Sequence, residues 1–123
     1  MSTMKIGEEL VALCRAGKNE EAIDKLFSAD VESVENMDMP GIGRVQKGVA
    51  AVKAKGAWWI ENNEVHEAVV EGPYPNGDRF IVRFKYDVTF KPTRKRTKMD
   101  ETALYTVANG KIVKEEFFYP TAE

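Results

Sequence analysis

The feature that most constrains the fold of this chain is a twelve-residue run in which apolar and polar side chains alternate. In residues 79–90, apolar side chains occupy every second position and mostly polar side chains lie between them. The apolar members are Phe80, Val82, Phe84, Tyr86, Val88 and Phe90. Successive side chains of a strand point to opposite faces, so the run predicts a long strand with one buried face. Such a strand needs partner strands and a second layer over its apolar face.

The rest of the second half predicts three more strands, separated by turn signals. We expect these strands at residues 65–71, 99–107 and 112–119. A cluster rich in glycine and proline at residues 72–77 precedes the long strand, and a basic turn follows it. Asn109-Gly110 is a strong hairpin signal before the last strand. The second half therefore predicts a sheet of long antiparallel strands.

The first half of the chain is helical in pattern, with two apolar stripes close together. The first helix carries Ile6, Leu10, Leu13 and Cys14 on one face. Gly17 predicts its end, and Asn19 can cap the next helix. The second stripe consists of Ala22, Ile23, Leu26 and Phe27. We expect the two helices to form a hairpin.

A short strand at residues 31–37 and a third helix at residues 46–62 complete the first half. A loop with Pro40, Gly41 and Gly43 joins them. One face of the third helix holds Val49, Val52, Gly56, Trp59 and Ile60. Helices first and strands afterwards indicate an α+β fold. Three N-terminal helices over a strongly curved antiparallel sheet would make a cone with a cavity between the layers.

Length, charge and composition predict one soluble domain, residues 1–123, in the cytoplasm. A chain of 123 residues has room for one core, and 43% of its residues are hydrophobic. The net charge of −2 argues against nucleic acid as a partner, so the five basic residues within 91–98 are interpreted as a solvated turn. No apolar run approaches the roughly 18 residues of a membrane span, and no signal peptide is evident. The single cysteine, Cys14, allows no internal disulfide and fits a reducing compartment.

The order of these elements resembles the nuclear transport factor 2-like superfamily and, within it, the SnoaL-like group. The resemblance covers nearly the whole chain, including the helix ending at Trp58-Trp59, and its most specific piece is the closing segment, residues 109–119. It implies a cone-shaped α+β barrel with a pocket between the helices and the concave sheet face. Members are often homodimers. Some are isomerases, polyketide cyclases or epoxide hydrolases that work without metal or cofactor, and many have no known activity.

The alternation also predicts which side chains of the neighbouring strands face the helices. A turn at residues 92–95 would place Tyr86 opposite Glu101, Phe84 opposite Ala103 and Val82 opposite Tyr105. The inner set would then be Met99, Glu101, Ala103, Tyr105 and Val107, followed by Val113, Glu115, Phe117 and Tyr119. This set requires a one-residue bulge at the Asn109-Gly110 hairpin. A slip of one residue would put Glu116 in the cavity instead of Glu115.

Four side chains are candidates for acid–base catalysis. Burial raises the pKa of a carboxyl group, so Glu115 and Glu101 are candidate proton-transfer groups. Tyr86 could donate a hydrogen bond to the oxygen of a substrate. His66, the only histidine, could be a general base or a structural residue at a strand edge, and it cannot form a multi-histidine metal site. The non-catalytic alternative for both glutamates is that they point to solvent or form ion pairs with lysine or arginine side chains.

The expected pocket walls are aromatic. The candidate ligand-binding residues are Trp58, Trp59, Phe84, Tyr105, Phe117 and Tyr119. The resemblance implies that Glu35 and Asp38 can reach the mouth of the cavity. It also places Phe117 where epoxide hydrolases carry an acid, and the tyrosine–aspartate pair of the ketosteroid isomerase branch is not recognisable.

We therefore expect a pocket for a small hydrophobic molecule, with cofactor-free isomerase or cyclase chemistry on a hydrophobic carbonyl compound. The alternatives are a ligand-binding module without catalysis and a dimerisation domain whose cavity is filled by its own aromatic side chains. An open cavity of about 300 Å³ or more with Glu115 inside would favour ligand chemistry. A cavity packed shut by Trp59, Phe84 and Phe117 would favour the alternatives.

Overall fold

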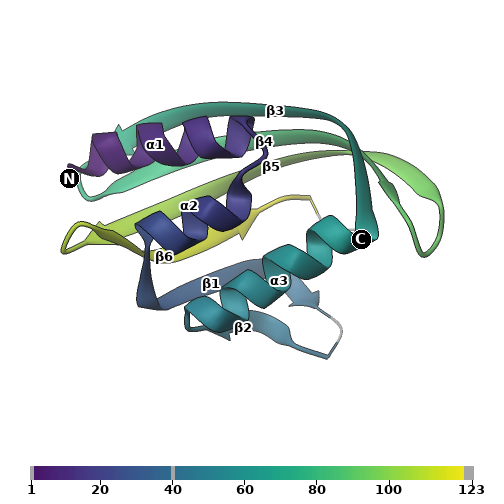
Figure 1. Cartoon of the computed structure of the whole chain (residues 1–123), viewed down its shortest axis with the longest axis horizontal. Helices are drawn as coiled ribbons and strands as arrows, with labels where there is room; N and C mark the ends of the chain where they lie inside the picture. Colours follow the sequence, from purple (N-terminus) through teal and green to yellow (C-terminus); the bar gives the residue numbers. More distant parts are fainter. Residues whose placement is uncertain (1, 40, 121–123) are drawn as a thin grey trace.

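Three helices and six strands make up the described part of the chain, which comprises residues 2–39 and 41–120 of a computed structural model. Figure 1 shows their arrangement. In chain order they are α1 (Thr3–Arg15), α2 (Asn19–Leu26), β1 (Phe27–Met39), β2 (Gly43–Lys47), α3 (Val49–Asn62), β3 (Asn63–Asn76), β4 (Arg79–Phe90), β5 (Lys95–Ala108) and β6 (Lys111–Phe118).

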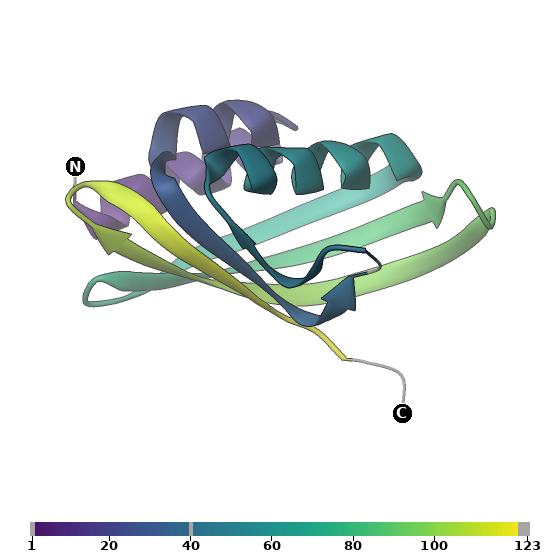
Figure 2. The ribbon, with the colours of Figure 1, turned by 90° about the horizontal axis from the view of Figure 1, so that it is seen from below.

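The six strands form one curved, unclosed sheet in the order β2-β1-β6-β5-β4-β3. Neighbouring strands are antiparallel except β1 and β6, which run parallel. All three helices lie over one face of this sheet (Figure 2). The α+β prediction, with N-terminal helices packed on a curved sheet, is confirmed.

The hydrophobic core lies between the helices and the concave face of the sheet. Phe80 and Val82 of β4 are fully buried, as the alternation predicts, and they belong to one cluster with Ile6 of α1 and Leu26 of α2. Polar and charged side chains such as Arg83 alternate with them on the outer face, where Arg83 pairs with Asp100. The period-two pattern of this strand therefore determines which face of the sheet the helices cover.

Local sequence signals account for both ends of α1 but not for the start of α2. The Ser2 side chain accepts a hydrogen bond from the backbone N–H of Lys5 and caps α1. Gly17 ends this helix in a left-handed conformation, with φ of 73°, as predicted. Asn19 does not cap α2. Lys18 occupies the cap position without a side-chain bond, and Asn19 is the first helical residue.

The main difference from the sequence prediction lies between β1 and α3. Residues 43–47, expected as loop and helix, form strand β2 and pair with β1 as a hairpin. The reason is Gly48, whose φ of 89° stops the strand and whose N–H bonds the Val31 carbonyl, so that α3 begins only at Val49. Phe27 opens β1 instead of ending the preceding helix. The predicted Pro40 loop position lies outside the described residues.

The predicted strand register was wrong by two residues between β4 and β5. Phe84, and not Tyr86, lies opposite Glu101, because the turn spans residues 91–94 with Phe90 opposite Lys95. The positive φ of Arg94, 57°, lies within this turn. A shift of two residues leaves every side chain on its predicted face, so the inner set of β5 is unchanged.

The predicted bulge exists but lies within the β5–β6 pair. The register shifts between Thr106, which faces Lys114, and Val107, which faces Ile112. Ile112 is consequently the fully buried residue at this end of β6, in place of the predicted Val113. Beyond the bulge the predicted inner set is recovered at Glu115.

Two further observations concern the surface. Residues 91–98 are exposed at the end of the β4–β5 hairpin, and Arg96 there pairs with Asp87 at 2.9 Å. Among the residues that the structure describes, no helix is long and apolar enough to cross a bilayer.

Adjacent residues on opposite faces of β4 should differ strongly in their contribution to stability. Phe80→Ala leaves a void under the helices and should lower the free energy of unfolding by about 3–5 kcal/mol. Ile81→Ala, at a side chain 40% exposed on the outer face, should cost less than about 1 kcal/mol. Urea unfolding followed by circular dichroism measures both, and equal losses would contradict the assignment of faces.

Candidate functional site

A cavity of about 390 Å³ lies between the helices and the concave face of the sheet. Side chains from all three helices and from β1, β4, β5 and β6 line it. Trp59, Phe84 and Phe117 form part of the wall and do not fill the space. The volume is in the range of small-molecule sites in proteins.

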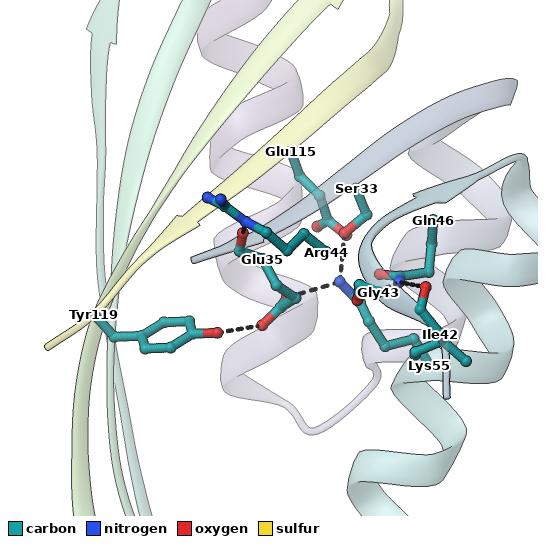
Figure 3. A network of polar contacts seen from close by, with 9 residues as sticks. All are labelled: Ser33, Glu35, Ile42, Gly43, Arg44, Gln46, Lys55, Glu115 and Tyr119. Atoms are coloured by element: carbon teal, nitrogen blue, oxygen red, sulfur yellow. Dashed lines mark hydrogen bonds and ion pairs between the residues drawn. The ribbon is translucent and has the colours of Figure 1, made fainter. Parts of the chain in front are cut away.

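A chain of polar contacts runs from the interior of this cavity to its edge (Figure 3). The Lys55 ammonium donates hydrogen bonds to Ser33 Oγ at 2.6 Å and to Glu35 Oε2 at 2.8 Å. Ser33 Oγ in turn donates to Glu115 Oε2 at 2.8 Å. At the other end, the Tyr119 hydroxyl donates to Glu35 Oε1 at 2.9 Å. One lysine thus bridges two carboxylates, to Glu35 directly and to Glu115 through a serine.

Three elements position this network. Ser33 and Glu35 alternate with Val31 on the inward face of β1. The parallel pairing of β1 with β6 puts Ser33 directly beside Glu115. Lys55 comes from α3, one turn after Val52, and its side chain is only 10% exposed.

Glu115 is a buried acid with one free oxygen. The residue is 5% exposed. Burial raises the pKa of Glu115 to about 7, against the opposing effects of Lys55 and of the Ser33 hydrogen bond, while Glu35 raises it further. Within residues 2–39 and 41–120, only Ser33 donates a hydrogen bond to this carboxyl, at Oε2. Both protonation states of Glu115 are therefore populated near neutral pH.

Glu101 is the second acid of the cavity and is half-buried. Burial raises its pKa to about 7, with Glu35 and Glu115 adding to the rise and Lys55 opposing it. No hydrogen bond or ion pair to its carboxyl occurs among the residues that the structure describes. Glu101 lies opposite Phe84 across the β4–β5 pair.

Two tyrosines, Tyr105 fully buried and Tyr86 partly buried, line the same cavity as the acids. Burial raises the pKa of both Tyr86 and Tyr105 above the ordinary value of 10, so their hydroxyls stay protonated and act as donors. Tyr105 is 3% exposed and lies directly opposite Glu115 across the β5–β6 pair. The Tyr86 ring packs against Trp59, with ring centroids 5.2 Å apart.

Most of the residues expected at the site line the cavity. They are Glu115, Glu101, Tyr86, Trp59, Phe84, Tyr105, Phe117 and Tyr119. His66 does not, because it occupies a bulge of β3 on the outer face and its Nε2 contacts Thr89 Oγ1 at 2.7 Å. Trp58 is 46% exposed and packs on Phe90, since adjacent helical side chains point about 100° apart. This position agrees with the alternative interpretation of His66 as a structural residue at a strand edge.

Sequence reasoning missed Ser33 and Lys55, although it placed Glu35 and Asp38 near the cavity mouth, and both of these acids line the cavity. A signal for Lys55 does exist. It lies three residues after Val52 and four before Trp59, as a lone charge on an otherwise apolar helix face. Ser33 carries a weaker signal, its period-two spacing with Glu35 along β1.

The remaining reactive groups near the cavity fit no metal or thiol chemistry. Burial raises the pKa of the Cys14 thiol to about 12, with the charge of Glu115 adding to the rise, so the thiol stays protonated. Across the described part of the chain, no three His, Cys, Asp or Glu side chains are grouped so that they could hold a metal ion.

Comparisons with known proteins agree with one another on the fold and the family. A family model described as a SnoaL-like domain matches residues 1–119. A protein of Mesorhizobium loti, described as a SnoaL-like polyketide cyclase and also as a carbohydrate phosphatase, is 46% identical. The match covers 97% of this chain and 100% of that one, with a TM-score of 0.91. No match was found among curated protein sequences.

Two more distant structures share the fold alone. One, from a Jannaschia species, is described as a SnoaL-like polyketide cyclase. It is 16% identical, with 94% of this chain and 83% of that chain covered and a TM-score of 0.74. The other, from Catenulispora acidiphila, has a ketosteroid isomerase-like fold and is in complex with trimethylamine. It is 22% identical, with 88% and 80% covered and a TM-score of 0.68.

Removing the cation of the network should raise the pKa of both buried acids. Lys55→Met takes away the positive charge that lowers the pKa of Glu115 and of Glu101, so both should titrate above their present value of about 7. Carbon NMR of the glutamate carboxyl groups, followed over pH, measures this. Lys53→Met, at an exposed lysine paired with Asp24, is the matched control and should leave both values unchanged. Identical titrations in the two variants would contradict the assigned role of Lys55.

Proposed function

The chain belongs to the SnoaL-like domain family, and on that premise we propose that it is an isomerase or cyclase acting on a small hydrophobic carbonyl compound. The observation that carries the proposal is the Glu115 carboxyl, buried inside the cavity with one oxygen held and a pKa near 7. A general base works best when its pKa lies near the working pH. The same group can also return the proton as an acid.

The proposed reaction is a proton transfer that needs only the side chains of this cavity. Ionised Glu115 takes a proton from the carbon beside the substrate carbonyl through Oε1, and the electron pair moves onto the carbonyl oxygen. Tyr105, opposite Glu115, donates a hydrogen bond to the resulting enolate, and Tyr86 is the second donor. In an isomerase, Glu115 then returns the proton to another carbon. In a cyclase, the enolate carbon bonds to a second carbonyl carbon of the same molecule, the electron pair of that C=O bond moves onto its oxygen, and Glu115 returns its proton to this oxygen.

Ser33 and Lys55 are positioning residues in this proposal. Ser33 donates a hydrogen bond to Glu115 Oε2, so the other carboxyl oxygen, Oε1, is available to the substrate. Lys55, bonded to Ser33, keeps part of the Glu115 population ionised at neutral pH by lowering its pKa. The apolar walls, with Trp59, Phe84 and Phe117, would hold the body of the substrate and exclude water.

Phosphatase chemistry, the second description of the Mesorhizobium protein, finds little support in this cavity. A phosphate site gathers several cationic or backbone donors around the anion. Of the described residues that line the cavity, Lys55 is the one cation, and its ammonium already bonds Glu35 and Ser33. Four acids line the same space and would repel a phosphate.

Replacing Glu115 should abolish proton exchange on a carbonyl probe. We expect the protein to accelerate exchange of the carbon-bound hydrogens of 2-tetralone in D₂O, measured by proton NMR. Glu115→Gln keeps the shape but removes the base, and should lower the rate by at least about 100-fold. The wild-type rate should rise with pH through about 7, because the ionised form is the base.

The matched control is Glu116→Gln, the same change one residue along β6 on the other face, where Glu116 lies near Lys114. It should retain the wild-type rate. Absence of acceleration by the wild type, or equal rates for Glu115→Gln and Glu116→Gln, would refute the catalytic proposal. Saturable binding of the ketone without exchange would leave a binding protein without catalysis.

A second proposed function is pairing of two copies of the chain through the outer face of the sheet. The proposed location is the cytoplasm, because a single free thiol is typical of a protein in a reducing compartment. Tyr74, Ile81 and Leu104 lie in one row across β3, β4 and β5. Phe118 on β6 is exposed near this row. Adjacent exposed apolar side chains of this kind mark interaction surfaces.

Light scattering during size-exclusion chromatography tests the pairing. We expect twice the chain mass of 13.8 kDa for the wild type and a single chain mass for Ile81→Glu, because the charge would be buried in the interface. Lys98→Glu, at the exposed far end of the same face, should remain a dimer. A wild type that elutes as a monomer at micromolar concentration would rule the pairing out.

A further inference from the structure

The charges of the cavity wall do not balance. Four acids line it, Glu35, Asp38, Glu101 and Glu115, and among the described lining residues Lys55 is the single base. The Lys55 ammonium is already bonded to Glu35 and Ser33. Asp38 is exposed at the rim, so water solvates it. The excess negative charge therefore rests on the two interior acids, Glu101 and Glu115.

Glu101 shares the cavity wall with aromatic rings, and no described residue donates a hydrogen bond to its carboxyl. Phe84 lies directly opposite it on β4, and the Tyr86 ring stacks on Phe84 with centroids 6.0 Å apart. The Trp59 ring packs on Tyr86 with centroids 5.2 Å apart. Glu101 and these three rings line the same cavity. A carboxylate and aromatic rings in one cavity attract a positive charge twice, by the negative charge of the acid and by the rings.

A second observation points to a ligand at the same place. Tyr105 is 3% exposed and lines the cavity, and its hydroxyl has no hydrogen-bond partner among the described residues. Gln46 Oε1 is the one fully enclosed unpaired polar atom among the described residues, so the Tyr105 hydroxyl opens onto the cavity space and can bond an occupant there. Its ring is held in place by stacking on Phe80, with centroids 5.0 Å apart. The hydroxyl is therefore a fixed polar contact for an occupant seated near Glu101 and Glu115.

We infer that the cavity takes an organic cation, a ligand carrying a protonated amine or a quaternary ammonium group, with the charge beside Glu101 and against Trp59 and Tyr86. The inference rests on the proposed function in requiring that a small molecule enters this cavity, and it adds the charge of that molecule. An anionic ligand is excluded by the same charges. The apolar remainder of the ligand lies along the wall toward Phe117.

Ionisation of the acids links this binding to pH. The titratable groups that line the cavity with Glu101 come from the elements around it: Glu35 on β1, Lys55 on α3, Glu115 on β6, Tyr86 on β4 and Cys14 on α1. Glu35 and Glu115 raise the pKa of Glu101 and Lys55 lowers it. Lys55 is the positive member, and the tyrosine and the thiol are neutral at working pH. Because a cation favours the ionised carboxylates, its affinity should rise as pH increases through about 7, and binding should release protons.

Choline and 3,3-dimethylbutan-1-ol test the inference as a matched pair, since they differ only by a charged nitrogen in place of a carbon. Titration calorimetry at pH 8.5 and pH 5.5 measures both. At pH 8.5 choline should bind at least about tenfold more tightly than the alcohol, and most of this preference should disappear at pH 5.5. A further titration at pH 7, carried out in two buffers of different ionisation enthalpy, should show that choline releases protons when it binds. Binding of the alcohol should release none.

Glu101→Gln should lower the affinity for choline at pH 8.5 by about tenfold and leave that for the alcohol within about twofold. Glu67→Gln, the same change at an exposed position of β3, is the control and should change neither. Thermal unfolding of each variant verifies that it is folded, and the wild-type comparison stands without any variant.

Two outcomes would overturn the inference. One is equal affinity of the wild type for choline and the alcohol at pH 8.5, which would leave the proposed small-molecule function intact but remove the charge from its ligand. The other is failure of choline to bind at millimolar concentration. Loss of proton exchange on 2-tetralone, by contrast, bears only on the proposed catalysis.

Discussion

The hydrogen bond from Ser33 to Glu115 joins residues 82 positions apart, and the candidate site depends on it. It exists because β1 and β6 lie side by side and parallel, which brings the end of the chain against its first strand. The same pairing connects the β1–β2 hairpin to the antiparallel strands of the second half. Without it, Glu115 would have no partner in the apolar interior, and the desolvation of its charge would be uncompensated.

The network resolves an electrostatic conflict that the fold creates. Two carboxyl groups lie inside a largely apolar cavity, where desolvation opposes their charge. Lys55 opposes that effect for both acids, but it is bonded to Glu35, so the compensation is partial. The outcome is an intermediate one, in which neither acid is fully ionised or fully neutral near pH 7. Acid–base chemistry requires that state, and a stronger network would remove it.

The sequence alone predicted the faces of the strands better than their pairing. Alternation in residues 79–90 determines which side of β4 is buried, and an error of two residues in the turn left Glu101 and Tyr105 on the correct face. Local patterns also marked Gly17 as a helix end. They contain no information on the parallel contact between β1 and β6, because two strands so far apart in the chain leave no spacing signal. The contact of Ser33 with Glu115 could therefore not be predicted, although the apolar face around Lys55 carries a signal for that residue. His66 lies at a bulge of β3, where it fits the structural alternative that the sequence left open.

Burying these two acids makes the stability of the folded chain depend on pH in an unusual direction. In the unfolded chain both carboxyls would titrate near the ordinary value of 4.5, whereas in the folded chain both have a pKa of about 7. Between these values the folded state holds protons that the unfolded state has lost, so the free energy of unfolding falls as pH rises. The contribution is on the order of 3 kcal/mol for each acid by pH 8. These two acids thus favour the folded state most in mild acid, and at the pH where the cavity is most highly charged a bound cation would stabilise the whole fold.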